Sequence, residues 1–195
     1  MKEIPHQGAL GTLRVTHWRR RRLPAHQWTA CEGRARLRFP AYSSALNRTH
    51  GLAFLVLVAM WLRAHGVEAP RVFQTDWGQE FGGDNPEHTQ RLSEQFLAPL
   101  QAGLARYPKG HNGQVERSHR TDDEAFYWPY ALRIQPPEDL LRHAGRWVVF
   151  YNMLRPHYGA GMEGRPPLTV LKHLGYTGPD TLTAFPPFAP GHHQY

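Results

Sequence analysis

The chain has 195 residues, a length that predicts one domain with an appended segment. Its 23 Lys and Arg residues outnumber its 16 Asp and Glu residues, and the net charge of +7 favours a polyanionic partner, with nucleic acid first. The single cysteine, Cys31, excludes an intramolecular disulfide framework and a cysteine-rich zinc module.

The sequence shows no sign of a membrane segment. Its longest apolar run, residues 52–62, has 11 residues, fewer than the about 18 that a membrane-spanning helix needs. The N-terminal region lacks an apolar stretch followed by a small-residue cleavage site. We therefore expect a cytoplasmic protein without a membrane partner.

Three strands are predicted in the first part of the chain, at residues 13–18, 27–31 and 35–42. In the third strand, apolar residues alternate with Arg36, Arg38 and Pro40. Because proline has no backbone N–H group, Pro40 favours a position at the edge of a sheet.

A long buried helix is predicted next, at residues 49–65, with Gly66 in the position that ends it. Residues 71–75 predict a short buried strand, and Asp76 follows at its carboxyl end. Residues 87–105 are broadly helical, with a break or kink at Pro99.

A loop at residues 107–113 precedes a helix predicted from Gln114 to about Trp128. Asn112 can act as its N-cap, and Glu116 lies in its first turn. A last amphipathic helix is predicted at residues 140–154, and a loosely ordered tail from Gly175 onward.

The order of these elements predicts a mixed α/β fold, in which antiparallel strands come first and a crossover strand follows. The predicted parts of the chain are an N-terminal leader at 1–10, a core at 11–158 and a Pro/Gly-rich, partly disordered extension at 159–195.

Asp76 and Glu116 are the strongest candidates for catalysis, since one ends a strand and the other opens a helix, and two such carboxylates can converge. Mg²⁺ and Mn²⁺ prefer oxygen ligands, and two such ions suit an in-line displacement at phosphorus. The alternative is that Asp76 caps the turn before Trp77 and that Glu116 only stabilises its helix.

Three segments occur in order along the chain, at residues 74–81 (QTDWGQEF), 112–120 (NGQVERSHR) and 151–157 (YNMLRPH). They resemble the signature blocks of the DDE-type integrase and transposase catalytic core. The similarity is to insertion-sequence transposases whose core is of the retroviral-integrase type, and it extends from residue 11 to residue 175.

This resemblance implies a ribonuclease H-like fold, with a mixed five-stranded sheet flanked by helices, at residues 11–158. It also implies metal-dependent cleavage and strand transfer of DNA during transposition or integration, with Mg²⁺ or Mn²⁺ as cofactor, as two ions where the site is competent. Asp76 matches the second acid of the family's catalytic triad and Glu116 the third. A homo-oligomer that holds two DNA ends is the implied assembly.

The sequence departs from the family pattern at the first acid, which the family places near the middle of the first strand. Its expected position is Thr16, and no Asp or Glu occurs between Glu3 and Glu32. A threonine cannot replace a bridging carboxylate, so the loss weakens at least one metal ion and with it the activation of the nucleophile.

Two residues are candidate replacements for this acid. Glu32 is the nearest acid, although it aligns with a position that is not catalytic in the family. His17 could ligate a softer metal, although a histidine beside a tryptophan more often packs. The helix-turn-helix region usual at the amino terminus of such transposases also has no counterpart here, which suggests a truncated or decayed copy, or a core fragment.

Two basic groups are candidates for contacts to DNA phosphates. The first group lies in the connection between the first two predicted strands. The alternative interpretation is that these residues only form the solvated tip of a hairpin. The second surrounds Glu116, and its arginines could instead pair with Asp123 and Glu124 on the same helix. The predicted DNA-binding residues are Arg19, Arg20, Arg21, Arg22, Lys109, Arg117 and Arg120.

Three functions stay open. The chain is an active transposase or integrase core, a non-catalytic DNA-binding remnant of one, or a structure-specific nuclease on the same fold. The nuclease needs an acidic cluster of its own, which the sequence does not contain. We interpret Tyr151 and His157 of the third block as packing residues.

Overall fold

The computed structural model describes residues 1–4, 7–75, 78–81, 83, 85–106 and 113–188. Asp76, Lys109 and Asn112 lie outside the described residues. The chain divides into two units, which we describe separately. The first comprises Met1–Ala45, Gln114–Gly175 and Thr183–Tyr195, and the second comprises Leu46–Gly113 and Tyr176–Leu182.

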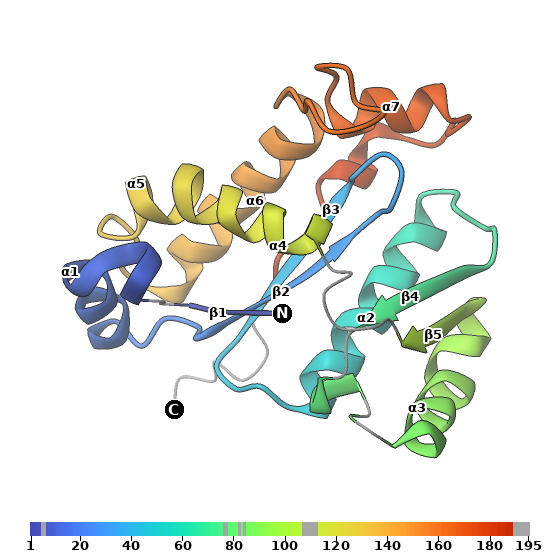
Figure 1. Ribbon diagram of the computed structural model, residues 1–195, viewed down its shortest axis with the longest axis horizontal. Helices are drawn as coiled ribbons and strands as arrows, with labels where there is room; N and C mark the ends of the chain where they lie inside the picture. The colour runs from blue at the N-terminus through green and yellow to red at the C-terminus, as the bar shows by residue number, and fades with distance from the viewer. Residues whose placement is uncertain (5–6, 76–77, 82, 84, 107–112, 189–195) are drawn as a thin grey trace. The chain divides into compact units, whose positions relative to one another are not determined.

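An antiparallel sheet in the order β1-β2-β3 forms the centre of the first unit (Figure 1). Its strands are β1 (Lys2–Glu3), β2 (His26–Cys31) and β3 (Arg38–Ser43). The predictions of strands at 27–31 and 35–42 are confirmed, although β3 begins at Arg38 and not at residue 35. Pro40 lies on β3, at an edge of this sheet, as predicted.

The predicted strand at residues 13–18 is wrong, because this segment belongs to helix α1 (Gln7–Arg20). Val15 and Trp18 are buried, and Trp18 meets the ring of Tyr127 edge to face at 5.6 Å. Their spacing of three residues suits one face of a helix and would place them on opposite faces of a strand. A short apolar run fits both periods, and packing decided in favour of the helix.

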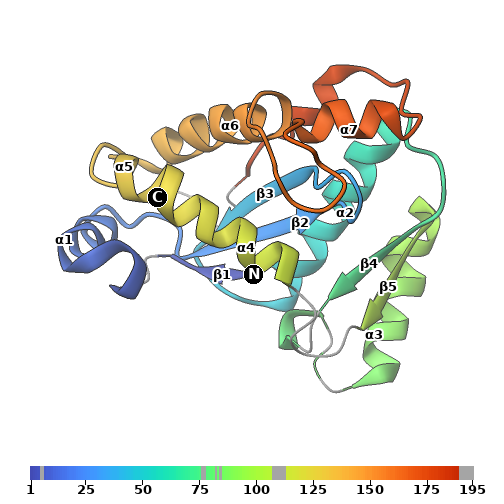
Figure 2. The ribbon, with the colours of Figure 1, turned by 45° about the horizontal axis from the view of Figure 1, so that its top comes forward.

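The helices that follow in the first unit agree with the sequence predictions at 114–128 and 140–154. Figure 2 shows α4 in front of the sheet and α6 above it. The elements are α4 (Gly113–Asp122), a π-helical turn η4 (Asp123–Tyr127), α5 (Trp128–Tyr130), α6 (Pro137–Met153) and α7 (Pro167–His173).

The second unit begins with helix α2 (Arg48–Ala64), whose N-cap Asn47 accepts a hydrogen bond from the backbone N–H of His50. Gly66 ends it with a φ of 79°, in the left-handed region that glycine favours, as predicted. None of the helices in the described ranges combines the length and the apolar character that a membrane crossing needs.

The two strands of the second unit, β4 (Arg71–Thr75) and β5 (Ala102–Arg106), pair in parallel. The prediction of strand 71–75 is confirmed, but β4 is only partly buried, and Val72 is 62 % exposed. The sequence predicted a helix over the residues of β5. Instead, the helical part ends around Pro99, Gln101 turns the chain with a φ of 54°, and pairing with β4 overrides the helix propensity of alanine and leucine.

The helical part before β5 has three pieces, and α3 packs against β5. They are α3 (Pro86–Leu92), the π-helical turn η2 (Ser93–Leu97) and the 3₁₀ turn η3 (Ala98–Leu100).

The mixed α/β class is confirmed, since both units combine helices with strands. A single five-stranded sheet is not formed among the described residues, where the strands make one sheet of three and another of two. The cause lies at residues 13–18: because α1 replaces the expected strand, only the two-residue β1 lies beside β2.

The expectation of a loose tail beyond Gly175 is wrong for the residues described. A 3₁₀ turn, η5 (Asp180–Thr183), is followed by Phe185, which is buried and meets the ring of Phe39 edge to face at 5.6 Å. The backbone carbonyl of Phe188 accepts a hydrogen bond from the N–H of Tyr42 on β3. The boundaries of the leader, core and extension stay predictions.

A buried ion pair joins β3 to α4. Arg38 is 2 % exposed and Asp122 is 1 % exposed, and the guanidinium donates to both carboxylate oxygens, at 2.9 and 2.5 Å. Gln27 and Trp147 each donate a further hydrogen bond to the Asp122 carboxylate, at 2.7 Å. Both charges are therefore compensated without solvent.

Asp122→Asn keeps the side chain's size and leaves the charge of Arg38 buried without a partner. We expect it to lower the free energy of unfolding by about 3–5 kcal/mol in urea denaturation. Glu124→Gln is the control, because it breaks the exposed Arg120–Glu124 pair on the same helical segment and should cost about 0.5 kcal/mol or less. Equal losses for the two variants would contradict this assignment.

Candidate functional site

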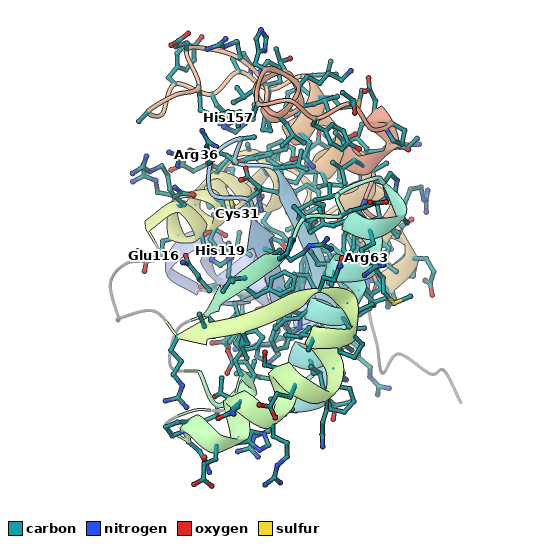
Figure 3. The ribbon with its side chains drawn as sticks, turned by 90° about the vertical axis from the view of Figure 1, so that its right-hand side faces the viewer. Cys31, Arg36, Arg63, Glu116, His119 and His157 are labelled. Carbon is teal, nitrogen blue, oxygen red and sulfur yellow. The ribbon has the colours of Figure 1, made fainter. Side chains whose placement is uncertain are left out.

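Glu116 lies in the first turn of α4, as predicted, and its side chain is exposed. Its carboxylate forms no hydrogen bond or ion pair with any residue that the structure describes. Figure 3 shows it at the rim of the unit, with His119 and Cys31 closer to the sheet. A free carboxylate in this position can bind a cation.

The inner face of α4 is anchored to the sheet through His119 and Asp122. Ser118 on this face is buried and donates a hydrogen bond within the helix, to the carbonyl of Val115 at 2.7 Å. The ring of His119 lies 3.2 Å from the hydroxyl of Thr29 on β2, and Asp122 binds Arg38. These contacts fix the orientation of the helix that presents Glu116.

Arg117 and Arg120 are exposed on α4 close to Glu116. Arg120 pairs with Glu124 at 3.7 Å, one helical turn further along the chain. For Arg120, this ion pair is the alternative to a DNA contact that the sequence analysis left open. Arg117 forms no ion pair within the described ranges, and Asp123 pairs with Lys2 instead. Arg117 is therefore the better placed of the two to meet a phosphate.

Asp76 lies outside the described residues, so its convergence with Glu116 stays a prediction. The same signature block contains an acid that the sequence analysis does not single out. Glu80, in the 3₁₀ turn η1 (Gln79–Phe81), is 7 % exposed, and in the described part of the chain its carboxylate has no hydrogen-bond partner. A Cβ atom on Gly78 would lie 2.5 Å from its Oε1 atom, so a larger residue at position 78 would displace the end of the Glu80 side chain.

The position predicted for the first acid, Thr16, is not on a strand. It lies on the exposed side of helix α1 and forms no part of the sheet that contains β2. The Nε2 atom of His17 lies 2.8 Å from the carbonyl of Ile134 and donates a hydrogen bond to it, which agrees with the interpretation of His17 as a packing residue.

Glu32, the alternative acid, is used by the turn between β2 and β3. Its carboxylate accepts hydrogen bonds from the backbone N–H groups of Arg34, at 3.0 Å, and Ala35, at 2.5 Å. The turn places Arg36 at a φ of 63° and needs this support. Glu32 therefore stabilises this turn, and a catalytic role for it stays a prediction.

The strand that does lie beside β2 presents a cation to α4. The Nζ atom of Lys2 on β1 donates to the carbonyl of His119 at 3.2 Å and pairs with Asp123. Burial lowers the pKa of Lys2, and Asp123 opposes this effect by stabilising the ammonium. Because side chains alternate along a strand, Glu3 lies on the opposite side from Lys2.

The third signature block has a structural role, as predicted. Asn152 is fully buried; it accepts a hydrogen bond from the N–H of Arg38 at 2.9 Å and donates to its carbonyl at 3.0 Å. These bonds occupy the free edge of β3. Tyr151 and His157 meet edge to face at 4.5 Å, which confirms them as packing residues.

Arg19–Arg22 lie at the end of α1 and in the turn that follows, and all four side chains are exposed. In the part of the chain that the structure describes, none of the four guanidinium groups forms an ion pair. They connect α1, rather than a first strand, to β2, which corrects the predicted hairpin. Lys109 lies outside the described residues.

Comparison of the chain with protein-family models, with curated proteins and with solved structures gave no match in any of the three. Within the described ranges, no three His, Cys, Asp or Glu side chains gather in a group that could hold a metal ion. The sulfur of Cys31 is a protonated thiol at neutral pH, since burial raises its pKa to about 11. In the first unit, the described part of the candidate site therefore consists of Glu116, Arg117 and Arg120.

His119 links the anchoring of α4 to pH. Burial lowers the pKa of His119 to about 3, with a further contribution from the N-terminal amine, while Asp122 opposes the shift. In the unfolded chain the imidazole titrates near its ordinary value of 6.5. Below that pH the unfolded state binds a proton that the folded state does not, so stability falls as the pH decreases from about 6.5 toward 3.

We expect His119→Gln to reduce the dependence of the unfolding free energy on pH by about 1.4 kcal/mol per pH unit between about pH 6 and pH 4.5. Urea denaturation at a series of pH values measures this slope. Burial also lowers the pKa of His157, to about 4, so part of the slope should persist. His173→Gln, at an exposed position of α7, controls for the loss of one histidine. A slope identical to wild type in His119→Gln would show the assignment to be wrong.

Proposed function

We propose that this chain is the catalytic core of a DDE-type DNA transposase or integrase, which cleaves and joins DNA phosphodiesters with Mg²⁺ or Mn²⁺. The observation that carries the proposal is the presentation of Glu116. Its free carboxylate lies in the first turn of a helix that Asp122 anchors, with Arg117 and Arg120 exposed beside it. This combines a metal ligand with phosphate-binding groups on one helix.

The order and direction of the strands support a ribonuclease H-like fold. Antiparallel strands β1, β2 and β3 come first in the chain, helix α2 follows, and β4 and β5 pair in parallel. The order of these elements follows that of the family, although the strands form two sheets and β1 is not the strand expected at residues 13–18.

Asp76 and Glu116 are the proposed metal ligands, and the exposed carboxylate of Glu116 suits the preference of Mg²⁺ for oxygen. When bound, two such ions supply an activated attacking oxygen and neutralise the leaving oxygen at phosphorus. Arg117 and the arginines at 19–22 bind the DNA backbone and position it, without reading sequence. A homo-oligomer would hold the two DNA ends.

A second candidate function is a non-catalytic, DNA-binding remnant of such an enzyme. It is favoured by the position of Thr16 on an exposed helical face and by Lys2, which directs an ammonium toward α4 from the strand beside β2. In this case the basic surface persists without a complete acidic site.

Metal binding separates the two candidates. Calorimetric titration with Mn²⁺ and Mg²⁺ should give binding to the wild-type chain and at least about a tenfold loss of affinity in Asp76→Asn and in Glu116→Gln. Both variants should lose strand transfer and keep DNA binding. Glu124→Gln is the control, since this acid is exposed on the same helical segment.

Each remaining outcome has one interpretation. DNA binding without metal binding identifies the remnant, and a chain that binds neither overturns the proposal as a whole. Thr16→Asp should not restore activity, because it adds a carboxylate to the exposed face of α1 and not to a strand.

Replacing Arg19–Arg22 with alanine tests the basic surface. For each phosphate that the variant no longer neutralises, the slope of log affinity against log salt should become shallower by about 0.9 for duplex DNA, because fewer counterions are released. Fluorescence anisotropy with a labelled duplex measures this slope at several salt concentrations. Arg146→Ala, which removes an exposed arginine of α6, is the control. An unchanged slope in the quadruple variant would exclude these arginines from the interface.

A further inference from the structure

A hollow of about 430 Å³ lies along the outer side of α1, in the first unit. Figures 1 and 2 show α1 beside α5 at one end of this unit. Four of the lining residues lie on one face of α1, because positions 13, 16, 17 and 20 are three or four residues apart along the helix. Another lining residue, Leu132, follows α5. The hollow is lined by Leu13, Thr16, His17, Arg20, Arg21 and Leu132.

We propose that this hollow binds one unpaired nucleotide of single-stranded DNA, with the base between Leu13 and Leu132 and the phosphates on Arg20 and Arg21. The choice of DNA as the ligand rests on the proposed function. The proposal adds a site apart from Glu116 and a preference for single strands, neither of which the catalytic residues require.

The charge of the hollow selects an anion. No acidic side chain lines it, and Arg20 and Arg21 form no ion pair within the described ranges. Arg19 and Arg22 continue the run on either side, so the positive charge extends beyond the hollow. A run of cations suits a ligand whose negative charges repeat along a backbone.

The walls of the hollow select an unpaired base. Leu13 is 68 % exposed and Leu132 is 37 % exposed, so both offer apolar surface to a ligand. A duplex presents phosphates and groove edges to a protein and keeps its bases stacked inside. A single strand offers the faces of its bases, which bind to apolar and aromatic side chains.

The ring of His17 is the third wall. Its hydrogen bond to the carbonyl of Ile134, at 2.8 Å, holds the ring in place and makes Nε2 the donor. A fixed wall reduces the entropy that is lost when a ligand binds. The volume also falls within the range of about 300–1,000 Å³ that is usual for sites that hold small molecules, so one nucleotide can enter.

The test compares the affinities for a labelled single-stranded oligonucleotide and for the matching duplex, by fluorescence anisotropy. Leu13→Ser and the double variant Leu13→Ser/Leu132→Ser should weaken binding of the single strand by about fivefold or more and leave duplex binding unchanged. Leu154→Ser is the matched control, since Leu154 is 65 % exposed beyond the end of α6. Thermal unfolding checks that each variant folds. If the double variant does not fold, the result for Leu13→Ser alone decides the test, because Leu13 is the more exposed of the two leucines.

Arg20→Gln/Arg21→Gln should weaken binding of both forms of DNA by about tenfold, with Arg146→Gln as the matched control. Equal binding of the single strand by wild type and the leucine variants overturns the hollow as a nucleotide site, while the proposed function stands if duplex binding persists. The same variants are also titrated with an acidic amphipathic peptide. If the leucine substitutions weaken binding of this peptide and leave binding of single-stranded DNA unchanged, the hollow is a site for a protein partner and the nucleotide proposal is wrong. A wild-type chain that binds no DNA overturns both proposals together.

Discussion

The ion pair between Arg38 and Asp122 is the constraint on which the first unit depends. Two opposite charges that are almost fully buried are costly to desolvate, and they persist only where geometry and further hydrogen bonds compensate both of them. Burial alone would raise the pKa of Asp122, but Arg38, Gln27 and Trp147 together hold it below its ordinary value. The pair adds little net stability compared with an apolar contact, yet it accepts only one arrangement of β3, α4 and α6. It therefore fixes the position of a helix more than it strengthens the fold.

The two faces of α4 follow from this anchoring. Its inner face holds the buried residues Ser118 and Asp122, which cannot turn outward without leaving Arg38 unpaired. Its outer face holds Glu116 and Arg117, whose side chains have no ion-pair partner in the described part of the chain. A helix that is rigid on one side and unpaired on the other is suited to binding a charged ligand, because little order has to be gained on binding.

Local signals predicted several elements. The apolar run of α2 and its end at Gly66, strand β4, and helices α4 and α6 all follow from periodicity and from residues that begin or end helices. The segments that failed depend on partners far away in the sequence: α1 is helical because Trp18 packs on Tyr127, and β5 exists because β4 pairs with it. At the site, Glu116 could be predicted from its place in a helix. Asp122 could not, because its partner Arg38 lies 84 positions earlier, on a strand where a charged residue suggested an exposed side.

The residues that anchor α4 are separate from those that the proposed function assigns to chemistry. Arg38, Asp122 and Asn152 hold β3, α4 and α6 together without any contribution from the exposed carboxylate of Glu116, so a change at a catalytic position leaves these contacts in place. Lys2 adds to them, since its ammonium binds both Asp123 and the backbone of α4 from the strand beside β2. This cation therefore stabilises the packing of α4 on β1. In the proposed function, the shape of the core thus depends on the buried network, while catalysis depends on Asp76 and Glu116.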